Sequence, residues 1–453
     1  MVIDPMKTKT LQDIIKDIEN ANLVPVNGRV SQLIGLVIES TGPETGIGDM
    51  CQIKTGRTSE PLLAEVVGFK KNKVLLMPIG DIGKISPGCP VVSTNKSFTI
   101  KLGEKIKGRV LDGFGKPIDG KGGIPFEEER PVYRKPPPVL KRKRITRPLS
   151  LGIRAIDGLL TIGKGQRVEI FAGSGVGKST LLGAIARNTS ADVNVIALIG
   201  ERGREVREFI EKDLGPEGLK RSIVVAVTSD EPPLLRVKGA YIATTIAEYF
   251  REKGNDVNLM LDSITRFCMA KREIGLSIGE PPSTKGYPPS VFSELPKLLE
   301  RAGMGEKGSI TGLYTVLVEG DDMDEPVSDS VRSILDGHIM LSRHLANLNH
   351  YPPIDVLGSV SRLMPDIITD VHKKISQEIK DIMASYQQSK DLIEVGAYSK
   401  GTNSKLDFAI THIDRINAFL RQGTEEKETL GSSISKLEAI LKEPGQKEGG
   451  DEE

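Results

Sequence analysis

The chain has 453 residues, of which 38% are hydrophobic and 27% charged, and its formal net charge is +1. This length allows two or three domains with their own cores, and the balanced charge gives no global sign of nucleic-acid binding. No run approaches the ~20 apolar residues of a membrane span, the N-terminus lacks the pattern of a signal peptide, and three isolated cysteines favour reduced, cytosolic thiols over a disulfide framework.

Residues 10–20 form the first predicted element, an amphipathic helix. Leu11, Ile14, Ile15 and Ile18 share one face, and polar residues cover the other. Two interpretations stay open, because such a helix can pack on its own domain or bind a partner.

The stretch 26–98 has an all-β pattern. Short alternating runs such as 29–38 and 62–69 are separated by Gly, Pro, Asp and Asn turns, which predicts a small closed barrel. Barrels that bind oligonucleotides stack bases on aromatic side chains, and the first hundred residues offer only Phe69 and Phe98. The sequence therefore favours a structural barrel.

Residues 99–150 form a Gly- and Pro-rich crossing into the next predicted domain. Within it, the segment 134–147 carries seven Lys and Arg side chains and three prolines. This composition predicts an extended, solvated linker, with a nucleic-acid-binding patch as the less favoured alternative.

From about 151 to 345, apolar runs alternate with helical patterns such as 234–251. This alternation predicts an α/β domain with a mainly parallel sheet. Ligands in such folds bind at the carboxyl ends of the strands. The expected strands are Arg167–Ala172, Asn194–Ile199, Ile223–Thr228, Val257–Leu261 and Gly312–Val318.

Residues 365–442 change to helical periodicity. Further helices are expected at 405–420 and 433–441, and the tail 443–453 has the Gly- and Glu-rich composition of a disordered segment. The first helical stripe consists of Ile367, Val371, Ile375, Ile379 and Ile382.

A glycine-rich loop follows the expected strand 167–172 and leads into a helix. Its glycines let backbone N–H groups point inward as an anion nest, Lys178 can reach terminal phosphates, and the hydroxyl of Ser179 can ligate Mg²⁺. The positive end of the following helix faces the same ligand. The flanking strand and helix favour nucleotide binding over a chance Gly-rich turn. The loop consists of Ala172, Gly173, Ser174, Gly175, Val176, Gly177, Lys178, Ser179 and Thr180.

A carboxylate is expected to complement this loop, and Asp262 ends the apolar run 257–261. A carboxylate at a strand end can orient Mg²⁺ through its waters. The alternative is an aspartate that caps the next helix. Given the loop upstream, the metal role is favoured.

Glu201 follows the expected strand 194–199 and is a second candidate. A glutamate at this strand end could polarise a water for in-line attack on the γ-phosphate. Glu205 and Glu208 show that charges are common here, so the spacing alone leaves a catalytic and a structural role equally open.

Two signals later in the chain are weak by themselves. Tyr351 stands beside Pro352 and could stack on an adenine, although tyrosines beside prolines are ordinary loop anchors. Arg362 could stabilise charge on the nucleotide of a neighbouring subunit, although a surface or ion-paired arginine is the more common case.

Taken together, these residues resemble the catalytic family of rotary ATP synthases, and within it the ATPases of flagellar protein export and of type III secretion injectisomes. The resemblance extends from about residue 26 to about 420. The resemblance rests on the loop that opens with Ala172 in place of glycine and on the segments 113–119 and 148–157. It also rests on Glu201 and Asp262 at the ends of their expected strands. It implies an N-terminal small β-barrel, a central RecA-like P-loop domain with a mainly parallel sheet, and a C-terminal helical domain.

The resemblance also implies roles for single residues. Glu201 matches the catalytic glutamate of the family, and Arg202 matches its neighbour at the phosphates. Asp262 matches the aspartate that orients Mg²⁺. Tyr351 matches the adenine-stacking tyrosine, and Arg362 matches an arginine finger supplied to the adjacent subunit.

The implied assembly is a homohexamer that uses ATP and Mg²⁺, because Glu201 and Arg362 in one chain let every subunit supply both halves of a site. The segment 319–326 resembles the loop that faces a central stalk protein. Further implied partners are a stator-like regulator at the N-terminal helix, an export gate, chaperones and exported substrates. The implied location is peripheral, at the cytoplasmic face of the cell membrane, and no nucleic acid is expected.

We therefore expect Mg²⁺-dependent ATP hydrolysis that energises export of flagellar proteins. The alternatives are an injectisome ATPase, a hexameric RNA motor of the termination-factor type, and a scaffold that binds nucleotide without hydrolysing it. The lack of barrel aromatics counts against the RNA motor. The expected divisions of the chain are 1–25, 26–98, 99–365, 366–442 and 443–453.

Overall fold

The computed structural model describes residues 27–56, 60–80, 82–173, 175–318 and 325–442. The predicted N-terminal helix, Ser174, most of the segment 319–326 and the tail 443–453 lie outside these residues. The chain divides into two compact units, with the boundary between Phe98 and Thr99. The finer divisions of the chain stay predictions.

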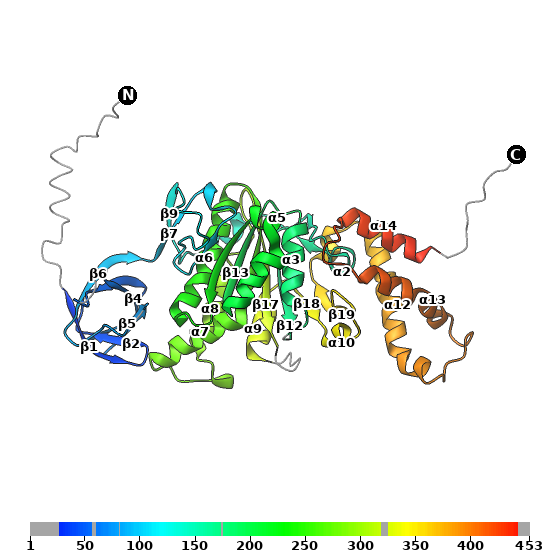
Figure 1. Cartoon of the computed structure of the whole chain (residues 1–453). Coiled ribbons are helices and arrows are strands. Elements are labelled where there is room, and N and C mark those ends of the chain that lie inside the picture. The colour runs from blue at the N-terminus through cyan, green and yellow to red at the C-terminus, as the bar shows by residue number, and fades with distance from the viewer. Residues whose placement is uncertain (1–26, 57–59, 81, 174, 319–324, 443–453) are drawn as a thin grey trace, which may run out of the picture. The chain divides into compact units, whose positions relative to one another are not determined.

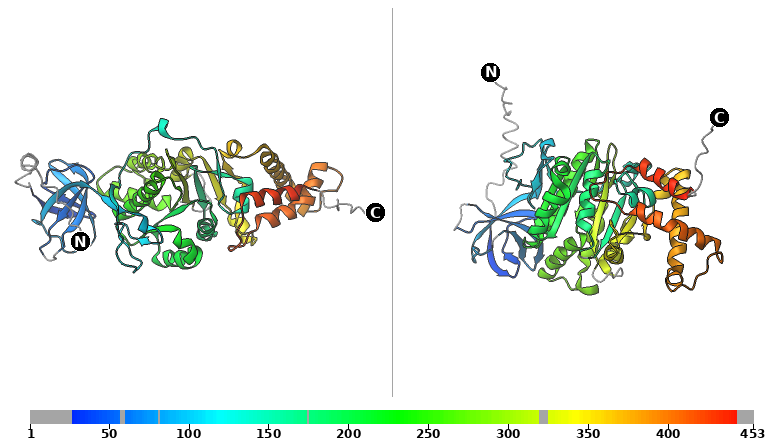
Figure 2. Two further views of the ribbon diagram at one scale, coloured as in Figure 1. Left: turned by 90° about the horizontal axis from the view of Figure 1, so that it is seen from above. Right: turned by 45° about the vertical axis from the view of Figure 1, so that its right-hand side comes forward.

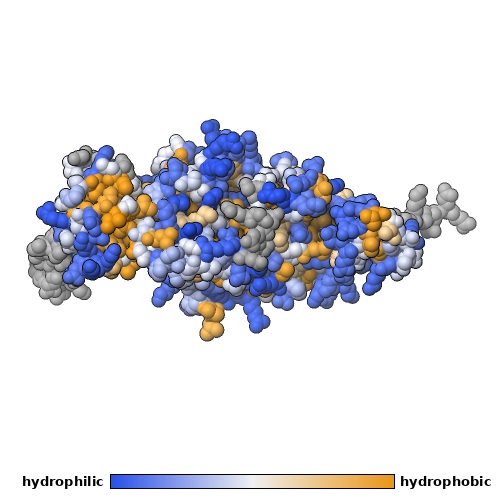
Figure 3. All heavy atoms as spheres, turned by 90° about the horizontal axis from the view of Figure 1, so that it is seen from below, coloured by the Kyte–Doolittle hydropathy of each residue, from blue (hydrophilic) through white to orange (hydrophobic). Residues whose placement is uncertain are grey.

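The first unit is a closed barrel of six strands in the order β1-β2-β5-β4-β3-β6 (Figure 1). The alternating run 29–38 spans two strands, because the chain turns at Gly35, whose φ of 56° suits glycine, and β1 and β2 pair antiparallel. Figure 3 shows hydrophobic surface on this unit. The strands are β1 (Gly28–Ile34), β2 (Val37–Ser40), β3 (Asp49–Ile53), β4 (Leu62–Lys70), β5 (Lys73–Ile79) and β6 (Pro90–Ser97).

The second unit is built on a nine-stranded sheet, with the order β19-β18-β12-β17-β15-β13-β14-β8 and β16 beside β17. All neighbours pair in parallel except β19 and β16, so the prediction of a mainly parallel sheet is confirmed. The five expected strands are present. The strands are β8 (Val110–Leu111), β12 (Arg167–Ala172), β13 (Val193–Glu201), β14 (Ser222–Thr228), β15 (Asp256–Asp262), β16 (Gly303–Met304), β17 (Ser309–Leu317), β18 (Gly337–Leu341) and β19 (Ile354–Ser361).

Helices cover both faces of this sheet (Figure 1). Leu182 of α3 packs in the core with Ile196 of β13, whereas Gly239 of α6 lies against Ile199 of the same strand. Residues 196 and 199 point to opposite faces because side chains alternate along a strand. The helices are α2 (Arg154–Leu159), α3 (Lys178–Asn188), α4 (Gly203–Glu208), α5 (Gly215–Lys220), α6 (Pro233–Glu252), α7 (Ile264–Ser277), α8 (Pro289–Leu299), α9 (Pro326–Ile334) and α10 (Arg343–Asn347).

The C-terminal helices belong to the same unit and share its core (Figure 2). One predicted contact is wrong, because Val371 is 63% exposed. Val371 lies in the first turn of α12, at its exposed end, whereas Ile375 and Ile379 further along the same helix are buried. The helices are α11 (Met364–Ile367), α12 (Asp370–Glu394), α13 (Ser404–Leu420) and α14 (Leu430–Leu441).

The basic linker is docked on the second unit rather than solvated along its length. Arg142 donates to Oε2 of Glu300 at 2.7 Å and to the carbonyl oxygen of Glu300 at 3.0 Å. Such bidentate contacts fix an arginine in place. The other short elements before α2 are β7 (Thr99–Leu102), the 3₁₀ turn η1 (Glu104–Ile106), β9 (Glu128–Pro131), the 3₁₀ turn η2 (Val139–Lys141) and β10 (Pro148–Leu149). Strand β7 pairs with β9, and β10 pairs with β11 (Ile162–Gly163).

Among the helices described here, none combines the length and the hydrophobicity needed to cross a membrane.

Candidate nucleotide site

The glycine-rich loop connects β12 to α3, where the sequence placed it. Gly175 and Gly177 have φ values of 77° and 92°, a backbone region that L side chains rarely adopt, so glycine is required at both positions. A Cβ on Gly175 would meet nothing within 4 Å, which leaves the loop open on that side. Ala172 and Val176 are 1% exposed and anchor the loop in the core. The arrangement is a strand, a nest of backbone N–H groups and a helix N-terminus, which together suit an anion.

Lys178 joins the loop to two strand ends. Strands β13 and β15 are parallel neighbours, so Glu201 and Asp262 emerge at the same edge of the sheet. Nζ of Lys178 donates to Oδ1 of Asp262 and lies 3.4 Å from Oε1 of Glu201. The structure therefore brings these three predicted residues into one cluster.

Thr315 is a member of this cluster that the sequence reasoning missed. Its hydroxyl donates to Oδ1 of Asp262 at 2.7 Å, and its side chain is fully buried on β17. The bond fixes the Asp262 carboxylate next to the loop. A polar residue within the apolar strand 312–318 was the available signal.

Burial and mutual charge tune the cluster. Burial, together with the nearby carboxylates of Asp262 and Glu205, raises the pKa of Glu201, although Lys178 opposes the shift. Burial disfavours the charge on Lys178, but Asp262 and Glu201 outweigh it and raise the pKa of Lys178. A charged lysine thus faces a glutamate with increased proton affinity, which is the property a general base needs near neutral pH.

Ser179 and Thr180 occupy the first turn of α3. Ser179 is half-buried beside Lys178, and Thr180 is exposed and hydrogen-bonds to Asp213. The hydroxyl of Ser179 and the carboxylate of Asp262 are hard oxygen donors of the kind that Mg²⁺ prefers. This donor set fits a magnesium ion.

Tyr351 lies on the other side of the loop. A Cβ on Gly177 would lie 3.7 Å from Cε1 of the Tyr351 ring, and this side chain is 45% exposed. Its carbonyl oxygen accepts a hydrogen bond from the backbone of Gln422 at 2.9 Å. A cavity of about 200 Å³ lies here, with a mainly apolar lining that includes Leu181 and Ala184. The ring therefore forms one wall of a cavity next to the loop, which suits a planar base.

Two predicted residues are not part of this cluster within one chain. The Arg202 side chain is 81% exposed and pairs with Glu205 at 3.3 Å. Arg362 is exposed and follows β19, where its backbone N–H bonds to Asp336 just before β18 begins. Because β18 runs parallel to β12, Arg362 lies at the edge of the sheet opposite the loop, roughly 15–20 Å away at the rise of an extended strand. Arg362 cannot complete the cluster of its own chain.

Glu169 is a buried carboxyl that the sequence reasoning also missed. It is fully buried on β12, and among the described residues neither of its carboxylate oxygens has a hydrogen-bond partner. Burial raises its pKa to about 8, against the opposing charges of Arg332 and Arg362. An acidic residue between Val168 and Ile170 was the signal.

Comparisons with known proteins agree with this architecture. Three family models match the chain: the β-barrel domain of the ATP synthase alpha/beta family at 30–95, its nucleotide-binding domain at 152–361, and the EscN ATPase C-terminal domain of type III secretion systems at 368–439.

Similar proteins span nearly the whole chain. A flagellum-specific ATP synthase of Bacillus subtilis is 52% identical and covers 96% of this chain and 99% of its own length. A type 3 secretion system ATPase of Sinorhizobium fredii is 48% identical, covering 90% of this chain and 91% of its own. The assembled ATPase EscN of enteropathogenic E. coli is 45% identical, with a TM-score of 0.86 over 91% of this chain and 99% of its own.

The strand-loop-helix cluster, the three-part architecture and these similarities lead to one assignment. The chain belongs to the ATP synthase alpha/beta family, in the group of flagellum-specific and type III secretion ATPases, and it is an ATPase.

Proposed function

We propose that this chain forms a homohexamer whose Mg²⁺-dependent ATP hydrolysis energises export of flagellar proteins through a type III apparatus. The observation that carries the chemistry is the cluster of Lys178, Glu201 and Asp262 at the mouth of the glycine-rich loop. It combines a cation for phosphates, a carboxylate for a metal and a glutamate whose pKa is raised.

Each residue has one role in the proposed mechanism. The loop N–H groups and Lys178 bind the phosphates of ATP, and Tyr351 stacks on the base. Ser179 and Asp262 would hold Mg²⁺, which would supply positive charge next to the phosphates. Glu201 accepts a proton from the attacking water as that water forms a bond to the γ-phosphorus and the bond to the ADP oxygen breaks.

Arg362 is the reason for proposing a site between subunits. It lies at the opposite edge of the sheet from its own loop, so a role at a nucleotide would have to be at that of a neighbouring copy. An arginine supplied in this way stabilises negative charge that develops on the phosphoryl group. EscN has been solved as an assembled ATPase, and a second structure contains assembled EscN in complex with its central stalk EscO. These two EscN structures support the proposal that this chain assembles into a ring that binds a central stalk protein.

The assignment to flagellar export rests on similarity. Relatives of about 50% identity include both flagellum-specific and type 3 secretion ATPases. The stator-like partner, the export gate, the chaperones, the exported substrates and the position at the inner membrane face follow from the same proposal.

The test replaces the chromosomal copy by a Glu201→Gln variant in the source bacterium. We expect loss of motility and of secreted filament protein at a normal level of the variant. If the variant loses effector secretion but keeps normal motility, the chain serves an injectisome and not flagellar export. Strong stimulation of the purified ATPase by single-stranded RNA would contradict both.

A further inference from the structure

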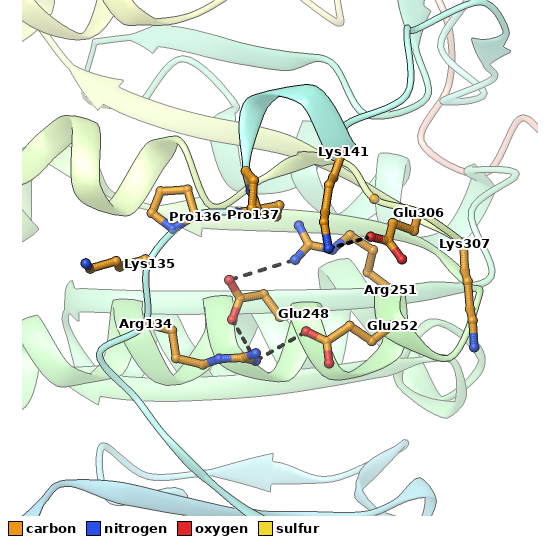
Figure 4. Close-up of a pocket in the computed structure, with 12 residues that line it drawn as sticks. Arg134, Lys135, Pro136, Pro137, Lys141, Glu248, Arg251, Glu252, Glu306 and Lys307 are labelled. Carbon is orange, nitrogen blue, oxygen red and sulfur yellow. Dashed lines mark hydrogen bonds and ion pairs between the residues drawn. The ribbon is translucent and has the colours of Figure 1, made fainter.

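A second cleft lies at the edge of the sheet opposite the nucleotide loop. It measures about 420 Å³ and is enclosed by the basic linker, the last turns of α6 and the hairpin between β16 and β17 (Figure 4). Pro137 and Lys141 stand at the two feet of an arch of the linker, above the side chains of α6. Nothing in the proposed ATPase mechanism uses this cleft.

The cleft carries an excess of positive charge. Five basic and three acidic side chains line it, and the acidic ones are already engaged. Glu248 accepts two hydrogen bonds from Arg301, at 2.9 and 2.7 Å, and Glu252 pairs with Arg130 at 2.7 Å. Within the lining, Arg134 lies 3.5 Å from Glu248 and 3.3 Å from Glu252. Glu306 contacts Lys141 at 3.7 Å, in a pair that is largely exposed to solvent. The three carboxylates are thus shared among Arg134, Lys141 and arginines outside the lining, which leaves an excess of positive charge that includes Lys135 and Lys307.

Arg251 is the buried member of this lining, with 4% exposure. Its Nη1 donates to the carbonyl oxygen of Arg301 at 2.7 Å, while its Nη2 lies 4.0 Å from Glu248, beyond hydrogen-bond distance. Burial, reinforced by the charges of Arg134 and Arg301, lowers the pKa of Arg251 even though Glu248 and Glu252 act against the shift. A buried guanidinium with incomplete compensation favours an added anion.

We propose that this cleft binds the phosphate group of an anionic ligand, with Arg251 at its floor and Lys141 at its mouth. A guanidinium offers paired donors to phosphate oxygens, and an ammonium adds a point charge. The nucleotide loop cannot account for such binding, because it lies at the other edge of the sheet. The proposal does not depend on ATP hydrolysis.

The phosphate has two possible sources, a free phosphate compound or a lipid headgroup. Val139 and Leu140 form the arch between Pro138 and Lys141 and are 78% and 99% exposed. Apolar side chains beside basic ones are typical of a segment that enters a lipid surface. A free phosphate compound would use the cleft without these two side chains.

The first experiment measures binding of inorganic phosphate by ³¹P line broadening. The full-length protein is saturated with a non-hydrolysable ATP analogue, which occupies the loop. We expect Lys141→Gln combined with Lys307→Gln to weaken phosphate binding about fivefold or more. Glu306→Gln should strengthen phosphate binding, because this substitution removes the carboxylate that competes for Lys141. A variant that was merely destabilised would not bind phosphate more tightly. Lys143→Gln, on the same linker but outside this cleft, is the matched control.

The second experiment separates the two sources by co-sedimentation with vesicles. Preference for vesicles that contain phosphatidic acid over pure phosphatidylcholine, lost in Val139→Ser with Leu140→Ser, supports a lipid headgroup. Phosphate binding without this preference supports a free phosphate compound. Equal phosphate binding by the wild type, Lys141→Gln with Lys307→Gln, and Glu306→Gln overturns the proposal.

Discussion

Nζ of Lys178 lies 3.4 Å from Oε1 of Glu201, within the cluster that also holds Asp262. A phosphate oxygen that accepts a hydrogen bond from Lys178 competes for the same ammonium. We therefore expect ATP binding to loosen the contact between Lys178 and Glu201 and to free the carboxylate for a water molecule. The residue that binds phosphate and the residue that activates water are coupled through this one contact.

Glu201→Gln tests the base. Glutamine keeps the shape of the side chain but cannot accept the proton, so we expect kcat to fall about 100-fold or more while ATP affinity stays within about threefold. Steady-state kinetics and equilibrium nucleotide binding measure the two effects. Glu211→Gln, at an exposed carboxylate that pairs with Arg207, is the control and should keep near-normal turnover. Near-normal turnover in Glu201→Gln would remove the base assignment.

Arg362→Ala tests the site between subunits. Because Arg362 is exposed and remote from its own loop, we expect this variant to assemble and bind ATP but to hydrolyse it about 1000-fold more slowly. Mixed with Lys178→Ala, it should regain part of the activity, since a ring of both variants contains some intact sites. If mixing at any ratio restores nothing although mixed rings form, the arginine does not act on a neighbour.

Tyr351→Ala tests the base-stacking wall beside Gly177. Removal of the ring should raise the KM for ATP about tenfold with little change in kcat, because the ring contacts the base and not the reacting phosphate. Tyr351→Phe keeps the ring and should behave as the wild type. A fall in kcat at saturating ATP, with KM unchanged, would argue for a structural role instead.

The sequence predicted the parts of this fold that depend on local pattern. Strands of six to nine residues, such as β12 and β17, were recognised because a buried parallel strand gives a continuous apolar run. The strands β18 and β19 were missed, because neither gives a continuous apolar run: buried residues are interrupted by partly exposed ones in both, and β19 is the edge strand. The turn at Gly35 was missed because residues on both sides of it are apolar.

The site was harder to predict than the fold, for a physical reason. The loop and the strand ends at Glu201 and Asp262 follow from the topology of a parallel sheet. Thr315 and Glu169 depend on which strands are neighbours, and the strand order is not written in the local pattern. The place of Arg362 at the far edge of the sheet depends on the antiparallel direction of β19, which the sequence did not indicate.

Glu169 leads to a prediction about stability and pH. The charges of Arg332 of α9 and of Arg362 after β19 act on it. Its register partners on the neighbouring strands are the titratable residues His338 of β18 and Tyr314 of β17. Its pKa is raised to about 8, above the ordinary value for glutamate. Between the ordinary pKa and 8, the folded state holds a proton that the unfolded state has lost. The free energy of unfolding therefore falls as pH rises through this window, by at most about 1.4 kcal/mol per pH unit from this group.

Glu169→Gln should remove this contribution, because the amide stays neutral at every pH while nearly preserving the volume of the side chain. We expect the variant to be more stable than the wild type at pH 8 and the advantage to shrink steadily toward pH 5. His338, whose pKa is lowered by burial, adds a pH dependence of opposite sign that is common to both proteins and cancels in their difference. Urea unfolding at a series of pH values measures this difference. Glu425→Gln, at a side chain that is 86% exposed, should show none. A difference between wild type and Glu169→Gln that does not change with pH would mean that Glu169 is ionised in the folded protein and paired with Arg332 or Arg362.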